Sequence, residues 1–162
     1  MSCRLSTRIV LFAAILALPA LLAPRAAPGQ ASSAEAEANI NLLQSRVEQF
    51  FGSLTNSAEG PERAVRQIVG NGPLKDRNDD INKLIEQASA LDQRYGAYSS
   101  HEPVSERAVG KDLIFLRYLY KGEKFPVVWY FTFYRTGANG SINREWQLIS
   151  LRFDSKVEAL EK

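Results

Sequence analysis

Arg117 is the residue whose type and position most strongly suggest ligand chemistry. It lies in the apolar run Leu113 to Tyr120, and counting by two along an extended strand places it on the same side as Phe115. A guanidinium on an apolar face needs a partner, because an unpaired buried charge is very costly. Its planar donors could hold a carboxylate or a phosphate in a pocket through two parallel hydrogen bonds. Alternatively, Arg117 pairs with an acid such as Glu102 or Asp112, or reaches solvent near a strand end.

The residue types that could support catalysis do not converge in the sequence. His101 is the only histidine, and its neighbour Glu102 points to the opposite face of a strand, so the two are poorly placed as a dyad. A general base there is conceivable, but we expect a solvent-exposed edge histidine, since no second histidine or cysteine completes a triad or a zinc site. Asp112 and Tyr95 are the types that an isomerase-like reaction needs, yet nothing brings them together. We predict no catalytic residue, no metal and no cofactor.

Aromatic residues are concentrated in the last third of the chain. They could line a pocket for a flat apolar ligand, or they could form a core and a subunit interface. If they line a pocket, we expect Tyr95 and Trp129 to contact the ligand together with Arg117. Tyrosines and Thr132 share one phase of the strands, and their polar tips suit a subunit interface better than a dry core.

Three apolar runs in this region predict consecutive strands. The runs are Leu113 to Tyr120, Val127 to Tyr134 and Trp146 to Phe153, and they scarcely alternate between apolar and polar residues. Strands of this kind are covered on both faces, whereas a strand with one solvated face alternates at period two. A weaker strand is expected at Ala97 to Val109, where Pro103 restricts it to a sheet edge or a bulge.

Helical periodicity precedes the strands. Apolar residues recur at spacings of three and four from Ile40 to Leu54, which predicts a long amphipathic helix. Pro61 and Gly70 frame a second, short helix, and a third is expected from Asn78 to Tyr95, ending at Gly96. Between the strands lie short turns, including Asn139-Gly140, that favour antiparallel neighbours, and the polar tail from Ser155 could add one helical turn.

Helices followed by an antiparallel sheet predict an α+β fold in which N-terminal helices pack on one face of a curved sheet. The long helix ending in Phe50-Phe51, the pair Tyr95-Gly96, and the patterns Phe131-Thr132-Phe133-Tyr134 and Trp146-Gln147-Leu148 resemble the nuclear transport factor 2-like superfamily, a cystatin-like α+β roll. This resemblance covers layout and aromatic placement over residues 32–162. It implies a cone-shaped pocket closed by helices and pairing of two subunits through the outer sheet face.

Residues 1–31 have the features of a signal peptide. Arg4 and Arg8 precede an apolar segment from Ile9 to Leu22, and Gly29-Gln30-Ala31 fits a cleavage site. The segment is shorter than the roughly 20 residues of a membrane span, although an uncleaved anchor remains an alternative. We therefore expect an exported protein, periplasmic or secreted, with one domain at 32–162 and no membrane attachment after cleavage.

Cleavage would also change the charge and the cysteine count. Three arginines and no acid lie in residues 1–31, which leaves 17 bases against 18 acids. No basic patch remains for nucleic acid, so we expect no nucleic-acid partner. Cys3, the single cysteine, would also be removed, so the mature chain would hold no disulfide and no thiolate site.

These observations favour a non-catalytic domain that binds a small apolar or anionic ligand, or a protein partner, and that forms a homodimer. One alternative is a cofactor-independent isomerase, dehydratase or hydrolase acting on a small apolar substrate. A second alternative is a dimeric interaction module whose pocket is filled by its own side chains.

Overall fold

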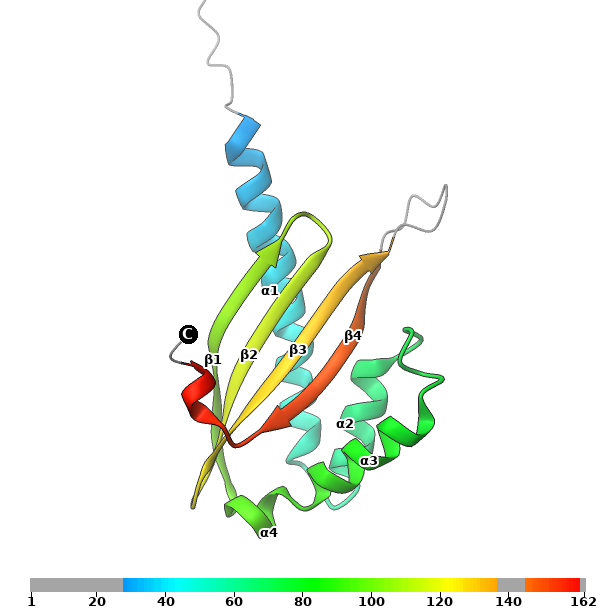
Figure 1. Cartoon of the computed structure of the whole chain (residues 1–162), viewed down its shortest axis with the longest axis vertical. Helices are drawn as coiled ribbons and strands as arrows, with labels where there is room; N and C mark the ends of the chain where they lie inside the picture. The colour runs from blue at the N-terminus through cyan, green and yellow to red at the C-terminus, as the bar shows by residue number, and fades with distance from the viewer. Residues whose placement is uncertain (1–27, 137–144, 161–162) are drawn as a thin grey trace, which may run out of the picture.

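The computed structural model describes residues 28–136 and 145–160. Helices come first along the chain and strands follow, as Figure 1 shows. The elements are α1 (Pro28–Leu54), α2 (Gly60–Val69), α3 (Asn78–Ser89), α4 (Leu91–Tyr95), β1 (Tyr98–Val109), β2 (Leu113–Gly122), β3 (Pro126–Thr136), β4 (Glu145–Asp154) and the 3₁₀ turn η1 (Val157–Leu160).

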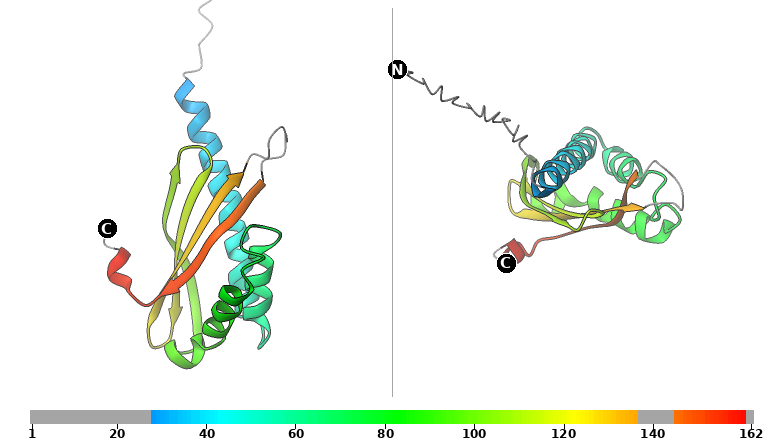
Figure 2. Two further views of the ribbon diagram at one scale, coloured as in Figure 1. Left: turned by 45° about the vertical axis from the view of Figure 1, so that its right-hand side comes forward. Right: turned by 90° about the horizontal axis from the view of Figure 1, so that it is seen from above.

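The strands form an open antiparallel sheet in the order β1-β2-β3-β4. Two views at right angles show α1 and α2 on one side of this sheet and η1 on the opposite side (Figures 1 and 2). We call the helix-covered side the inner face and the other side the outer face. The predicted α+β fold is confirmed, with sequential strands as neighbours.

Most of the elements expected from the sequence are present. Pro103 lies on an edge strand, which confirms one of the two predicted positions, and the β1–β2 register shifts between Pro103 and Ser105. The prediction of a single helix up to Tyr95 is wrong. α3 ends at Ser89, and a separate short helix, α4, follows after Ala90. Gly96 then ends α4 with a φ of 87°, a conformation that glycine adopts readily.

Two predictions fall outside the part of the chain that the structure describes. They are the segment 1–27 of the signal peptide and the Asn139-Gly140 turn. Within the described residues, no helix is long and apolar enough to cross a membrane.

Aromatic rings fill the layer between α1 and the inner face. The Phe50 ring centroid lies 5.0 Å from that of Trp129 and 5.4 Å from that of Phe131, with the rings edge to face. Phe51 packs against the same two rings, and all four side chains are at most 2% exposed. This packing puts core side chains where the sequence suggested a cone-shaped pocket.

The residues that the structure describes cover the outer face only partly. Val128 is completely buried there, but Phe115 is 36% exposed and Tyr134 is 42% exposed. Tyr130, Thr132 and Tyr134 of β3 and Arg117 of β2 do share the outer face, which therefore tolerates water better than the apolar runs suggested. The expectation that all the strand tyrosines share this phase was wrong, because Tyr118 and Tyr120 are buried on the inner face.

Candidate anion-binding site

Three arginines line one shallow cleft on the outer face. Arg107, Arg117 and Arg152 come from β1, β2 and β4, and the cleft between them has a volume of about 280 Å³. No acidic residue is among its lining residues, which are Ser105, Arg107, Phe115, Leu116, Arg117, Tyr130, Phe131, Thr132 and Arg152. We call this group the arginine cleft.

Strand register places these arginines around Tyr130. Arg117 is the partner of Tyr130 across β2–β3, and Arg152 is its partner across β3–β4, so all three side chains share one face. The guanidinium carbon lies 5.7 Å from the Tyr130 ring centroid for Arg117 and 4.0 Å for Arg152. The ring therefore lies between two planar donor groups and makes a cation–π contact with each.

Arg117 and Arg152 each have a further interaction within the chain. Arg152 forms a 3.4 Å ion pair with Asp154, and its side chain is 62% exposed. Two acids were considered as partners for Arg117. Of these, Glu102 forms an ion pair with Lys121 at 2.8 Å, and Asp112 forms one with Arg135 at 3.2 Å. Guanidinium groups that line a cleft can donate hydrogen bonds to the carboxylate or phosphate oxygens of a ligand.

The structure does not bring the three predicted ligand-binding side chains into one place. Arg117 lies on the outer face, whereas Trp129 is fully buried on the inner face and Tyr95 ends α4 and packs at the margin of the core. Counting by two correctly put Arg117 with Phe115, but it could not say which side of the sheet the helices would cover.

A second, more apolar groove lies between α3 and the edge strand β4. Its volume is about 290 Å³, and Arg152 lines it as well as the arginine cleft. Apolar side chains make its walls. Arg77, Lys83, Arg152 and the acid Asp80 also line it, and Arg77 forms a 3.0 Å ion pair with Asp80. The walls are formed by Val69, Leu74, Ile81, Leu84, Ile149, Leu151 and Phe153.

His101 is not the solvent-exposed edge histidine that we expected. Its side chain is only 15% exposed, and its ring stacks on Phe51 with centroids 4.3 Å apart. Nδ1 lies 2.6 Å from the Tyr98 hydroxyl and Nε2 lies 2.7 Å from Glu48 Oε2. The expectation was wrong because α1 packs across this end of β1 and brings Glu48 to the histidine, a contact between residues 53 positions apart.

Asp92 and Tyr120 form a second polar pair that the sequence did not indicate. The Tyr120 hydroxyl donates to Asp92 Oδ1 at 3.1 Å, and both residues line one cavity. A carboxylate and a phenol in one cavity are the minimum set for the isomerase-like alternative. Their bond to each other, however, uses the hydroxyl proton that such a reaction would donate to a substrate. From the sequence, Tyr120 is expected with the other strand tyrosines at a subunit interface, whereas the structure buries it on the inner face, and no sequence pattern links it to α4.

Two buried tyrosines make the free energy of unfolding depend on pH in the alkaline range. Burial raises the pKa of Tyr118 and of Tyr120 above the ordinary value of about 10, and the nearby carboxylates Glu48 and Asp92 raise it further. The folded chain thus keeps two protons that the unfolded chain releases above about pH 10. Their stabilising effect is complete below that pH and is lost as the pH rises further.

We expect the free energy of unfolding to fall by about 1.4 kcal/mol per pH unit for each of these tyrosines above pH 10. Urea denaturation at pH 9 and pH 11 measures this loss. A double variant, Tyr118→Phe with Tyr120→Phe, should lose markedly less than the parent protein between the two pH values. An equal loss in both proteins would show that these phenols do not cause it.

The fold and the cleft define an α+β protein with an open four-stranded sheet and an arginine-lined site on its outer face. Comparisons with protein-family models, with curated proteins and with solved structures each found no match. The resemblance to the nuclear transport factor 2-like superfamily therefore remains a prediction from the order of elements and the placement of aromatic residues.

Proposed function

We propose that this protein is an exported, non-catalytic binding module whose ligand is a small anion held in the arginine cleft. The carrying observation is that three guanidinium groups from three strands line one cleft that has no acidic lining residue. Each could donate to a carboxylate or phosphate oxygen, and Tyr130 offers an aromatic surface for an apolar part of the ligand.

The packing of the core also supports a ligand site on the outer face. Aromatic core residues occupy the layer between α1 and the sheet, which leaves the ligand a place on the outer face. Among the residues described here, no group of histidine, cysteine and acidic side chains is suited to a metal ion.

The test is binding of benzoate compared with benzyl alcohol, its neutral counterpart, by calorimetry at fixed ionic strength. We expect benzoate alone to bind, and Arg117→Met to weaken its binding about ten-fold or more, because hydrogen bonds to charged groups contribute about 1.5–3 kcal/mol each. Arg63→Met, which removes an exposed arginine of α2, is the matched control and should have no effect. Broad destabilisation by Arg117→Met without a change in benzoate affinity would assign Arg117 a structural role instead.

A homodimer through the outer face is the second candidate function, and the exposed Phe115 and Tyr134 side chains favour it. Face-to-face pairing would bring the arginine clefts of two copies close together, and like charges oppose such contact. Sedimentation at micromolar concentration tests this candidate. A monomer at all concentrations in this range would remove the homodimer and leave the anion-binding proposal in place.

A further inference from the structure

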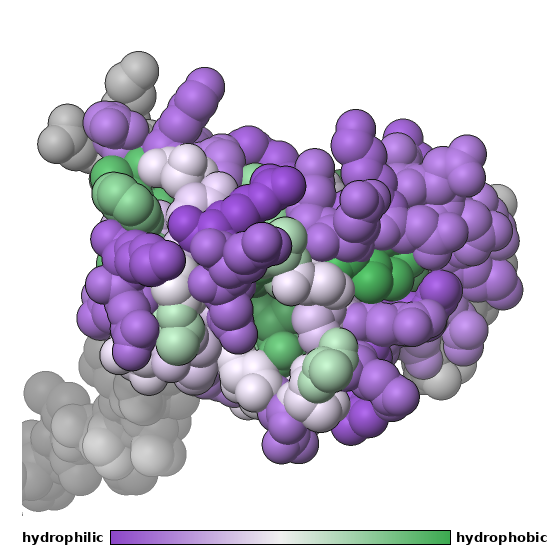
Figure 3. Space-filling view, turned by 90° about the horizontal axis from the view of Figure 1, so that it is seen from below, coloured by the Kyte–Doolittle hydropathy of each residue, from purple (hydrophilic) through white to green (hydrophobic). Residues whose placement is uncertain are grey.

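The cavity lined by Asp92 and Tyr120 lies at the end of the molecule where α1 is followed by α2 and where α4 meets the start of β1. Figure 3 views this end and shows hydrophobic surface sunk within hollows that hydrophilic residues surround. The cavity has a volume of about 240 Å³. Its lining residues are Leu54, Thr55, Asn56, Ser57, Ala58, Pro61, Ala88, Ser89, Leu91, Asp92, Tyr98 and Tyr120.

Most hydroxyl protons around this cavity are already bonded within the protein. Thr55 donates to the Phe51 carbonyl at 3.0 Å, and Ser89 donates to the Ile85 carbonyl at 2.9 Å. The Tyr120 hydroxyl donates to Asp92. Each of these hydroxyl oxygens still has lone pairs that can accept a hydrogen bond.

The Tyr98 hydroxyl completes the same pattern. When the His101 ring is neutral and Nε2 donates to Glu48, Nδ1 is the acceptor for the Tyr98 proton, across 2.6 Å. The cavity wall is therefore rich in acceptors, and its further side-chain donors are those of Asn56 and Ser57. A ligand that fits such a wall brings its own donors.

Charge and aromatic surface point in the same direction. Asp92 is the only ionisable carboxylate, and there is no lysine, arginine or histidine, among the lining residues. The carboxylate uses Oδ1 for Tyr120, and its second oxygen can accept another bond. The Tyr98 and Tyr120 rings lie 5.2 Å apart, and aromatic rings attract cations through their faces.

We propose that this cavity binds a primary ammonium group on a short aliphatic chain. An ammonium carries three donors and no acceptor, which complements the wall described above, and its charge complements Asp92. Leu54, Pro61 and Leu91 would contact the aliphatic part. This site is separate from the arginine cleft, and the proposal does not depend on the proposed function.

The test is a titration of the whole protein with butylammonium, monitored by the NMR chemical shifts of the backbone amides. Salt at about 150 mM screens the surface charges. Binding should be saturable, with a dissociation constant on the order of 1 mM, which is realistic for a ligand of so few atoms. Shifts should centre on Asp92, Tyr98 and Tyr120. Equimolar 1-butanol, which has the same chain without the charge, should cause no comparable change.

Asp92→Asn keeps the shape of the side chain and removes its charge, and it should weaken butylammonium binding about ten-fold or more. Glu86→Gln removes an exposed carboxylate of α3 that does not line the cavity, and Arg117→Met removes a charge from the arginine cleft; both should leave this binding unchanged. Equal binding of 1-butanol, no saturable binding, or shifts centred elsewhere would overturn the proposal. If Asp92→Asn does not fold, the comparison of butylammonium with 1-butanol on the unmodified protein still tests the proposal.

Discussion

Replacing Trp129 with alanine is expected to lower the free energy of unfolding by about 3–5 kcal/mol, the range for large-to-small changes of aromatic core residues. Trp129 is fully buried, and its ring centroid lies 4.5 Å from that of Phe153 and 5.0 Å from that of Phe50. Alanine would leave a cavity between α1 and the sheet that these rings cannot close without moving. Chemical denaturation followed by circular dichroism measures the loss.

Trp129→Phe is the matched control for this experiment. It keeps an aromatic ring and removes Nε1, which is buried without a hydrogen-bond partner among the described residues. An unpaired buried donor destabilises the folded state, so its removal offsets part of the lost packing. We expect Trp129→Phe to cost far less than alanine. A loss below about 1 kcal/mol for alanine would instead indicate that the indole lines an open space, as the sequence allowed.

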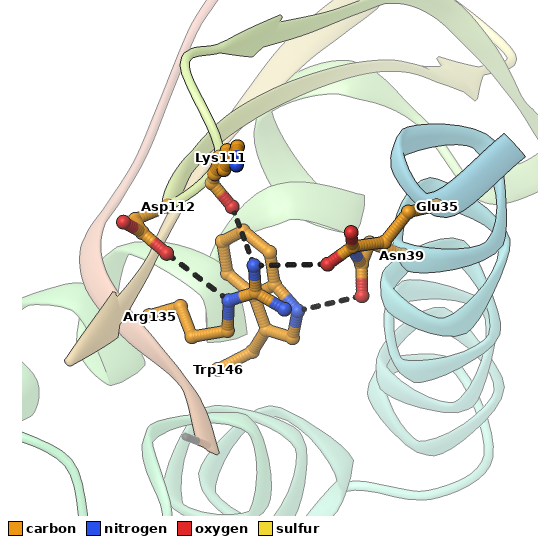
Figure 4. A network of polar contacts seen from close by, with 6 residues as sticks. All are labelled: Glu35, Asn39, Lys111, Asp112, Arg135 and Trp146. Carbon is orange, nitrogen blue, oxygen red and sulfur yellow. Dashed lines mark hydrogen bonds and ion pairs between the residues drawn. The ribbon is translucent and has the colours of Figure 1, made fainter. Parts of the chain in front are cut away.

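Replacing Arg135 with methionine is expected to lower the free energy of unfolding by about 2–3 kcal/mol, because it breaks several charge-assisted hydrogen bonds at once. Figure 4 shows Arg135 at the centre of this network. Its donors lie 3.2 Å from Asp112 Oδ1, 2.9 Å from the Lys111 carbonyl and 3.3 Å from Glu35 Oε1. The side chain is only 14% exposed, so water replaces these partners poorly.

The network joins elements that are far apart in the chain. The Arg135 guanidinium lies 5.1 Å from the Trp146 ring centroid, and the Trp146 indole donates to Asn39 of α1 at 3.2 Å (Figure 4). Loss of the arginine should therefore loosen α1 from β3 and β4 at this end of the sheet. Hydrogen exchange in α1 would report that loosening directly.

Arg66→Met is the control for the arginine experiment. Arg66 pairs with Glu62 one helical turn away, and both side chains are more than half exposed at 51% and 57%. Exposed pairs at this spacing contribute about 0.3–0.5 kcal/mol. Similar losses from Arg66→Met and Arg135→Met would mean that the Arg135 network does not stabilise the fold beyond an ordinary surface pair.

Local sequence signals predicted the elements well, since periodicity and breakers act over a few residues. The stretch from Ile40 to Leu54 became the buried side of α1, and Pro61 and Gly70 mark the ends of α2. The failure at Ala90 has the same origin: the apolar stripe continues through Leu91, and the pattern contains no glycine or proline to announce the break.

Contacts between distant residues could not be predicted in this way. The strand phase placed Arg117 correctly relative to Phe115, but the choice of inner face depends on where α1 and α2 pack. His101 was misjudged for the same reason, because Phe51 and Glu48 reach it from α1. The arginine cleft itself needs the register of four strands, which brings Arg152 and Arg117 to opposite sides of Tyr130.

The position of a bound anion tests the central claim most directly. A crystal structure of the protein with 4-iodobenzoate, located by the anomalous signal of iodine, would show where the carboxylate lies. We predict that its oxygens accept hydrogen bonds from Arg117 and its ring contacts Tyr130, on the face of the sheet away from α1. Iodobenzoate found beside Trp129, between α1 and the sheet, would contradict this account and restore the internal pocket.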